Sequence, residues 1–328
     1  MCAWSGTGPE TIILTLCWGG VWARVWGSTC APRGSTGRRE GLELGFTGPS
    51  DRPRFGGLVA FLSDFGESSP YVGVCKGVML RRNPWVKVVD LCHSVRPFSV
   101  IEGGWLLRLS VPYFPQGTVF LAVVDPGVGS SRRPLAVRAR SGFTLVGPDN
   151  GLLLPALSAF GGVEEAREIA NPSLVEGYVS RTFHGRDLFA PVAAALAGGL
   201  PLVEVGPPVE ADALAPYPLS GPVSGDGVVE GHVVWVDRFG NVCTDVEVFR
   251  AQEALGGLVV GDEVWVELRG LRFGLPFLEF FAQAQPGTSM VIPDSWGFLS
   301  LAVNGGSFLD VLGFDPLGEK AIFWRRCS

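Results

Sequence analysis

An acid, an arginine and a histidine occupy two glycine-containing segments of this chain. Asp125 and Arg132 lie in "DPGVGSSRR", and His184 lies in "TFHGRD". A carboxylate and a guanidinium that meet in a cleft hold each other ionised and can position a third group or a water molecule. A turn followed by exposed arginines is the alternative interpretation. Spacing alone leaves His184 open as a catalytic base, a hydrogen-bonded surface residue or a helix cap.

Three loops with polar residues follow apolar runs that predict β-strands: "SDFG" (63–66), "DPGVGSSRR" (125–133) and "GPDNGLL" (147–153). In open α/β sheets the carboxyl ends of the strands line the ligand crevice. Asp64 is placed there to accept two hydrogen bonds from a ribose diol, although a turn-forming aspartate has the same sequence pattern. The glycines of 125–133 lack the Lys-Ser/Thr of a P-loop, so they are weak evidence for a phosphate site.

Strand and helix signals alternate through the first part of the chain, which predicts an α/β domain on a mainly parallel sheet. In the first helix, Ser69 is expected as the N-cap and Pro70 as the first helical residue, and Asn83–Pro84 ends it. Another helix is expected over 188–197, with Gly198–Gly199 as its stop. The other expected elements are strands at 58–62, 86–91 and 117–125 and in "LAVRAR" and "FTLVGPD", and helices in "FSVIEGGWLLRLSVPYF" and "GLLLPALSAF".

A change of composition divides the chain further along. Residues 201–226 contain six prolines, which is typical of a linker, and glycine and asparagine turns join β-type runs beyond it. The C-terminal part is therefore expected to be a small all-β domain, barrel-like or a sandwich. The predicted division is an N-terminal extension (1–56), an α/β domain (57–208), a linker (209–226) and a β-domain (227–328).

Bulk composition excludes several classes of protein. The net charge of −6 over 328 residues disfavours a nucleic-acid partner, because binding phosphates needs a basic surface. Seven cysteines without a CxxC pair fit reduced thiols in the cytoplasm rather than disulfides or zinc ligands. With no His/Cys/Asp cluster at ligand spacing, we expect no metal. No GxSxG or Cys–His pattern indicates acyl transfer.

The first 55 residues differ from the rest in their tryptophans and in a Gly/Arg/Ser stretch, "APRGSTGRREG". The apolar run around 12–25 is too short and too interrupted to span a membrane, so no membrane association is expected. It also lacks the positive start of a secretory signal. An extension outside the fold, a misplaced start codon and an atypical targeting segment remain open.

Several motifs, taken together and in order, resemble the S-adenosyl-L-methionine (SAM) hydroxide adenosyltransferases, relatives of the SAM-dependent fluorinases and chlorinases. The resemblance covers about residues 57–315. The motifs are "SDFGESSPYVGVCKGVML", "DLCHSVRPFSVIEGG", "TVFLAVVDPGVGSSRRPLAVR", "GPDNGLL", "TFHGRD", "VDRFGN" and "SWGFLSLAVNGGSF".

The resemblance implies attack of water or hydroxide at the ribose C5′ of SAM, which gives adenosine and L-methionine. SAM is then the substrate, and no cofactor is implied. It further implies a homotrimer in which each SAM lies between the α/β domain of one subunit and the β-domain of its neighbour.

Residue roles also follow from the resemblance. Asp125, Arg132 and His184 match the set credited with orienting or activating the water. Asp64 matches the ribose contact. The other matches are Asp237 and Ser295 for the methionine part, Asn241 and Asn304 for adenine, and Phe98, Phe239 and Phe281 for apolar walls.

Two departures and two alternatives accompany the resemblance. Ser69 stands where the family has an aspartate, and Trp296 stands where a fluorinase has an arginine. A halide adenosyltransferase is one alternative activity, but the halogenase-type tyrosine position is Asp125 here and the fluorinase's halide-contacting serine is Gly185. A non-catalytic SAM or adenosine sensor is the other.

Overall fold

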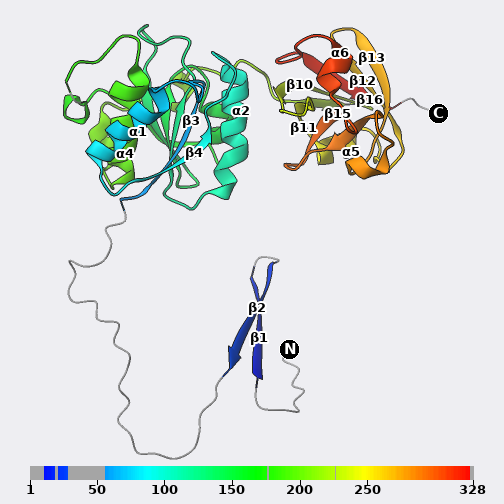
Figure 1. The fold of residues 1–328 in the computed structure, drawn as a ribbon, viewed down its shortest axis with the longest axis horizontal. Helices are drawn as coiled ribbons and strands as arrows, with labels where there is room; N and C mark the ends of the chain where they lie inside the picture. Colours follow the sequence, from blue (N-terminus) through cyan, green and yellow to red (C-terminus); the bar gives the residue numbers. More distant parts are fainter. Residues whose placement is uncertain (1–10, 19–20, 29–55, 176, 226, 326–328) are drawn as a thin grey trace, which may run out of the picture. The chain divides into compact units, whose positions relative to one another are not determined.

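The computed structural model describes residues 11–18, 21–28, 56–175, 177–225 and 227–325, and it divides into two compact units, 1–53 and 54–328. In the first unit, strands β1 (Thr11–Trp18) and β2 (Val21–Ser28) form an antiparallel hairpin (Figure 1). The sequence did not predict this hairpin. The predicted boundaries within the chain stay predictions.

A six-stranded sheet in the order β4-β3-β5-β7-β6-β8 forms the centre of the α/β part. Strands β4, β3, β5 and β7 are parallel to one another, whereas β6 is antiparallel to both β7 and β8. The α/β class is confirmed, and β8 is an element that the sequence did not predict. The strands are β3 (Leu58–Ser63), β4 (Lys87–Cys92), β5 (Val119–Val123), β6 (Pro134–Ala139), β7 (Thr144–Pro148) and β8 (Val163–Glu168).

Helices cover both faces of this sheet, which is why β5 and β7 are buried on both faces and apolar almost throughout. Helices α1 (Tyr71–Arg82) and α4 (Ala190–Ala197) pack on the face that carries Phe61 and Leu121. Helices α2 (Val100–Ser110) and α3 (Leu154–Ala159) share the core of the opposite face. Figure 1 shows α2 across the sheet from α1 and α4.

The start of α1 differs from the prediction. Pro70 is the N-cap, and no side chain caps the helix. The Ser69 hydroxyl instead donates to the backbone oxygen of Phe65 at 2.9 Å. The prediction that Ser69 caps α1 is therefore wrong, because its hydroxyl closes the turn of the preceding loop. The ends of α1 at Asn83 and of α4 at Gly198 agree with the prediction.

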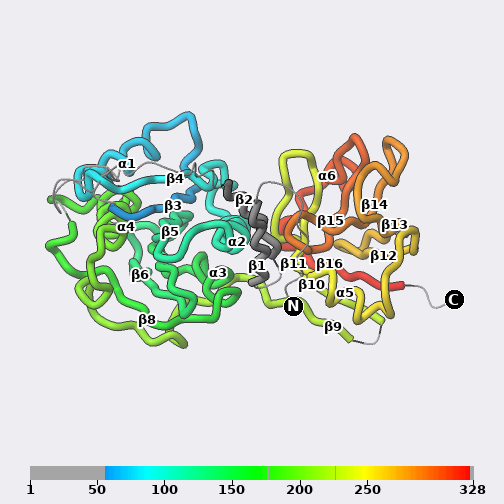
Figure 2. The backbone as a smooth tube through the Cα atoms, turned by 90° about the horizontal axis from the view of Figure 1, so that it is seen from below, coloured from blue at the N-terminus to red at the C-terminus, as the bar shows by residue number. Residues whose placement is uncertain are grey.

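The C-terminal part is an antiparallel sheet in the order β13-β12-β16-β10-β11-β15-β14, with β9 (Val223–Gly225) beside β10. An isolated bridge between Phe277 and Val291 brings its two ends together, so the sheet is nearly closed, as predicted (Figure 2). The strands are β10 (Val228–Val236), β11 (Val242–Glu247), β12 (Glu263–Leu268), β13 (Leu271–Pro276), β14 (Ser289–Pro293), β15 (Phe298–Val303) and β16 (Lys320–Trp324); helices α5 (Val248–Ala254) and α6 (Phe308–Leu312) accompany them.

The proline-rich segment between the two sheets is docked in part on the α/β sheet. The backbone N–H of Val209 donates to the Ala166 oxygen at 2.9 Å, and that of Ala215 donates to an Asp149 carboxylate oxygen at 2.8 Å. No helix among the described residues is both long and apolar enough to cross a membrane.

Candidate active site

Asp125, Arg132 and His184 are joined in one chain of hydrogen bonds. Arg132 Nε lies 3.0 and 3.1 Å from the two Asp125 carboxylate oxygens, and Arg132 Nη2 also donates to Asp125 Oδ2. Arg132 Nη2 lies 2.7 Å from His184 Nδ1. Asp125 follows β5, Arg132 precedes β6, and His184 immediately precedes the π-helical turn η3 (Gly185–Phe189). The fold thus assembles the set from two loops, the one between β5 and β6 and the one that leads into η3.

The ion pair at the centre of this chain is buried. The side chains of Arg132 and Asp125 are only 8% and 6% exposed, and the guanidinium carbon lies 5.2 Å from the centre of the Phe189 ring. Within the described part of the chain, Arg132 Nη1 is buried without a hydrogen-bond partner. A buried pair of this kind is weak evidence for stability, since desolvation offsets much of the attraction, and fixed orientation is its clearer benefit.

The Arg132 contact defines which nitrogen of His184 carries the proton. A guanidinium has only donors, so His184 Nδ1 must accept. Burial lowers the pKa of His184, and the positive charge of Arg132 lowers it further. The negative charges of Asp125 and Asp187 oppose this shift but do not cancel it. The imidazole is therefore neutral near pH 7, and its hydrogen is on Nε2. His184 presents an N–H donor from its second nitrogen.

Asp64 is held by the backbone of a strained residue. Asp64 Oδ2 accepts from the Phe98 N–H at 2.8 Å, and Phe98 has a φ of 67° while its side chain is largely exposed. A non-glycine residue in the left-handed region costs free energy and is frequent at functional sites. Burial raises the pKa of Asp64, and the Phe98 N–H opposes that rise.

Asp64, Asp125 and His184 line one cavity of about 250 Å³ in the α/β part. Phe98 lines it as well, so the cavity brings together four of the residues that the resemblance assigned to the site. Three aromatic rings that the sequence did not predict for the site also line it: Phe65, Tyr71 and Phe183, with ring centres 5.1–5.9 Å apart. Adjacency gives a signal for two of them, because Phe65 follows Asp64 and Phe183 precedes His184.

Gly185 lies against this aromatic cluster. A Cβ atom added to Gly185 would lie 2.9 Å from the Phe65 ring and 3.5 Å from the Phe183 ring. Contacts under 3.0 Å require a neighbour to move. The absence of a side chain at position 185 is therefore coupled to the packing of Phe65.

All six residues predicted in the C-terminal part line a second, larger cavity of about 890 Å³. They are Asp237, Phe239, Asn241, Phe281, Ser295 and Asn304. Phe239 and Phe281 are exposed apolar side chains there. Asn304 is fixed by its side-chain N–H, which donates to the Ala284 oxygen at 2.8 Å.

Asp237 organises the turn that carries three of these residues. Its Oδ1 accepts from the backbone N–H groups of Phe239 and Asn241 at 2.8 and 2.9 Å, and its Oδ2 accepts from the Asn241 side chain at 2.7 Å. Gly240 closes the turn with a φ of 83°, where a Cβ would collide with Ser307. Asp237 thus has a structural role besides any ligand contact.

The floor of the larger cavity was not predicted. Cross-strand partners from β10, β11, β15 and β14 form one row across the sheet, and all line the cavity: Trp235, Cys243, Ser300 and Ile292. Burial raises the pKa of Cys243 to about 12, so its thiol is neutral. Only the strand register brings these residues together, and no local motif announces them.

Asp294 is a further carboxylate in the lining of this cavity. Its Oδ1 accepts from the backbone N–H groups of Trp296 and Phe298 at 2.8 and 2.9 Å, and burial raises its pKa. Asp294 Oδ2 is buried with no hydrogen-bond partner among the described residues. Its position next to the predicted Ser295 was the available signal. The two cavities have no lining residue in common.

This chain belongs to the SAM hydroxide adenosyltransferase family. The model of that family's N-terminal domain matches residues 59–206, and that of its C-terminal domain matches residues 231–319.

The chain is also similar to individual curated proteins and to a solved structure. The chain is 44% identical to the (R)-S-adenosyl-L-methionine hydrolase of Salinispora tropica over 79% of this chain and 94% of the relative, and 41% identical to the enzyme of that name from Thermus thermophilus over 78% and 95%. A fluorinase from Actinoplanes sp. is 32% identical over 75% and 91%. An uncharacterized conserved protein of Thermotoga maritima superposes with a TM-score of 0.76 at 38% identity, over 81% of this chain and all of the other.

Proposed function

We propose that this chain hydrolyses S-adenosyl-L-methionine to adenosine and L-methionine. The observation that carries the proposal is the Asp125–Arg132–His184 chain of hydrogen bonds, in a chain that is 41–44% identical to three relatives named (R)-S-adenosyl-L-methionine hydrolase. Water attacks the ribose C5′, and the C5′–S bond breaks with its electron pair going to sulfur. The sulfonium becomes a neutral thioether, so the leaving group needs no proton, and catalysis is mainly placement of the nucleophile.

The geometry supports separate roles for the three residues. His184 Nε2–H donates to the water oxygen and holds it through one lone pair, which leaves the other for attack. Arg132 fixes the tautomer of His184 and the orientation of Asp125. The attacking water loses one proton as the C–O bond forms. Asp125 is the carboxylate of the set, and it is the group we assign to accept that proton before release to solvent.

The larger cavity and Asp64 supply binding in this proposal. Asp64 accepts from the ribose hydroxyls, and Asp237 and Ser295 contact the methionine part. Asn241 and Asn304 contact adenine, while Phe98, Phe239 and Phe281 form apolar walls. Ser69, whose hydroxyl is engaged with the Phe65 backbone, makes no ribose contact in this assignment.

Halide transfer is the second candidate, because fluorinases are 32–33% identical to the chain. Two features favour water as the nucleophile. Gly185 offers no hydroxyl to a halide, and the nearby Phe65 ring leaves no room for a Cβ there. The cavity lining carries two carboxylates, Asp64 and Asp125, whereas Arg132, which pairs with Asp125, is not in the lining; this arrangement disfavours an anion.

We further propose a homotrimer with shared sites. In one chain the residues assigned to water and ribose line one cavity, whereas those assigned to methionine and adenine line another. A complete site then needs both cavities, each from a different subunit. We place the protein in the cytoplasm, in line with the free thiols of Cys75, Cys92 and Cys243.

Product chromatography tests the activity. Each sulfonium epimer of SAM is incubated with the protein, with and without chloride. Adenosine and methionine are the expected products both with and without chloride. A chlorinated nucleoside would replace hydrolysis with halide transfer, and tight binding without turnover would identify a sensor.

A further inference from the structure

A second histidine is linked to the loop that carries Asp64. Ser63 Oγ lies 2.7 Å from His93 Nδ1, and His93 Nε2 lies 3.0 Å from Asp90 Oδ1. Lys76 Nζ donates to Asp90 Oδ2 at 2.6 Å. Ser63 and His93 are buried, whereas Lys76 and Asp90 are partly exposed. The chain of hydrogen bonds thus runs from the surface to the residue directly before Asp64.

Serine, histidine and aspartate are the residue types of an acyl-transfer triad, but this set does not act as one. Ser63 has no exposed surface, so a substrate carbonyl cannot reach its hydroxyl. The network must therefore act through its neighbours.

The proton positions in this network follow from Asp90. Its pKa is lowered, because the hydrogen bonds from Lys76 and His93 outweigh the opposing effect of partial burial. An ionised Asp90 only accepts, so His93 Nε2 carries a hydrogen; when the ring carries no second hydrogen, Nδ1 accepts from the Ser63 hydroxyl. Ser63 Oγ keeps a lone pair for the Phe65 N–H, 3.4 Å away.

The same two loops are joined at two more points. The backbone N–H of Gly66 donates to the His93 oxygen at 2.8 Å, and the Phe98 N–H donates to Asp64 Oδ2 at 2.8 Å. Residues 63–66 and 93–98 are thus held together on both sides of Asp64. The Ser63–His93 bond is the buried side-chain contact of this set.

We propose that Ser63, His93 and Asp90 are positioning residues that hold the Asp64 carboxylate where it accepts from the ribose hydroxyls. The proposal rests on the proposed function, which assigns those hydroxyls to Asp64. Asp90 fixes the tautomer of His93, His93 orients Ser63, and Ser63 fixes the loop. Removing any one of these hydrogen bonds keeps the Asp64 carboxylate but leaves its orientation toward the ribose hydroxyls less well fixed.

The test compares the binding of adenosine with that of 2′,3′-dideoxyadenosine, which lacks the ribose hydroxyls, by calorimetry on the full chain. Ser63→Ala removes the inner link. Asp90→Asn removes the charge at the partly exposed end, where the risk to folding is smaller. Each variant should bind adenosine about tenfold more weakly, because an aimed hydrogen bond to a carboxylate is lost, with little change for the dideoxynucleoside.

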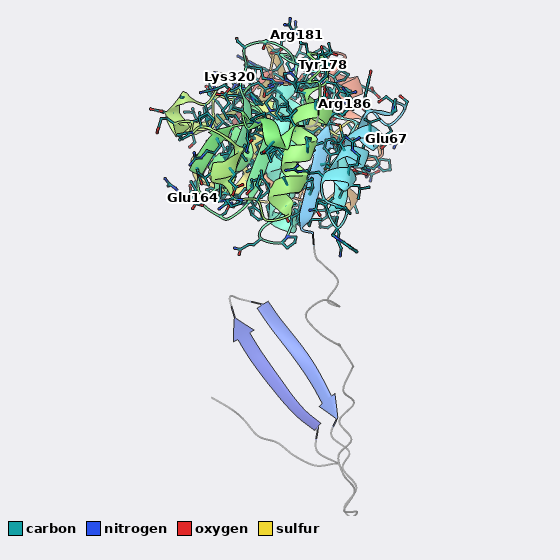
Figure 3. All side chains as sticks on the ribbon, turned by 90° about the vertical axis from the view of Figure 1, so that its left-hand side faces the viewer. Glu67, Glu164, Tyr178, Arg181, Arg186 and Lys320 are labelled. Atoms are coloured by element: carbon teal, nitrogen blue, oxygen red, sulfur yellow. The ribbon has the colours of Figure 1, made fainter. Side chains whose placement is uncertain are left out.

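Glu230→Gln is the matched control. Glu230 Oε2 accepts from Lys320 Nζ at 2.8 Å in a surface carboxylate–lysine pair on β10 and β16, and Lys320 is labelled in Figure 3. This variant should bind both nucleosides like the wild type.

The outcomes separate the two proposals. Equal losses for both nucleosides, or no loss for either, in a wild-type background that does discriminate between them would overturn the positioning role alone. A wild type that binds the two nucleosides equally would overturn the ribose assignment of Asp64 and the positioning role with it.

Discussion

Arg132 Nη2 donates to His184 Nδ1 at 2.7 Å while the same guanidinium binds both carboxylate oxygens of Asp125. This contact makes His184 an acceptor at Nδ1 and a donor at Nε2, because a guanidinium cannot accept. Spacing alone had left His184 open as a base, a surface residue or a cap. The structure places it in the lining of a cavity beside Asp64 and Asp125, and the donor role follows from its arginine neighbour.

Substitutions of His184 should show whether this residue acts as a hydrogen-bond donor or as a catalytic base. His184→Ala should lower kcat about 100-fold, with a much smaller effect on SAM binding, because the residue orients water rather than substrate. His184→Gln retains an N–H group near the position of Nε2 and should recover part of that loss. Single-turnover rates and calorimetric affinities measure the two effects. If Gln and Ala were equally impaired, the donor role would be wrong.

The pH dependence should follow the neutral imidazole. Because burial and Arg132 lower the pKa of His184, activity should persist below pH 6.5 and fall only as the pH passes through the lowered value. The unfolded chain binds this proton more readily than the folded one, so protonation also reduces stability as the pH falls.

Arg132→Met should move that titration upward. The variant removes a neighbouring cation and leaves the Asp125 charge uncompensated, and both changes favour the imidazolium. With three histidines in the chain, the NMR titration of the His184 ring can be assigned by comparison with His184→Gln. An unchanged or lower pKa in Arg132→Met would contradict the electrostatic account.

Gly185→Ser should destabilise the fold through Phe65. The new Cβ would lie 2.9 Å from that ring, and overpacking of this kind costs about 1–3 kcal/mol. Thermal unfolding should show the loss, and Phe65→Leu in the same chain should recover part of it, with Phe65→Leu alone as the control. Additive losses in the double variant would show that the two positions are independent.

Mixing two inactive variants tests the shared site. His184→Ala damages the smaller cavity, and Ser295→Trp should block the larger one from an exposed position without disturbing the core. The two variants are mixed in equal amounts and their subunits exchanged. A shared site is then intact when its smaller cavity comes from Ser295→Trp and its larger cavity comes from His184→Ala. Each of these conditions holds for half of the sites, so about a quarter of wild-type activity should return. No recovery despite verified exchange would place the whole site within one chain.

Much of the fold was predictable because its signals are local. The apolar runs at β3 and β5 and the stops at Asn83 and Gly198 lie within short windows of sequence. The predicted N-cap of α1 was wrong because the Ser69 hydroxyl has a competing partner, the Phe65 backbone, which sequence spacing does not reveal.

The residues of the site also fall into those with a local sequence signal and those without one. Polar residues in loops such as Asp64 and Asp125 are visible as departures from apolar runs. The row from Trp235 through Cys243 and Ser300 depends on strand register, and the Ser63–His93 contact joins residues 30 positions apart. Three-dimensional pairing creates these features, so the sequence carries no direct mark of them.

The origin of the oxygen in the product tests the central claim most directly. The full chain is incubated with SAM in heavy-oxygen water, and the adenosine formed is analysed by mass spectrometry. Hydrolysis at C5′ predicts one heavy oxygen in the adenosine, at the 5′-hydroxyl, and none in methionine. Unlabelled adenosine, or a nucleoside that carries a halogen in place of that hydroxyl, would contradict the account.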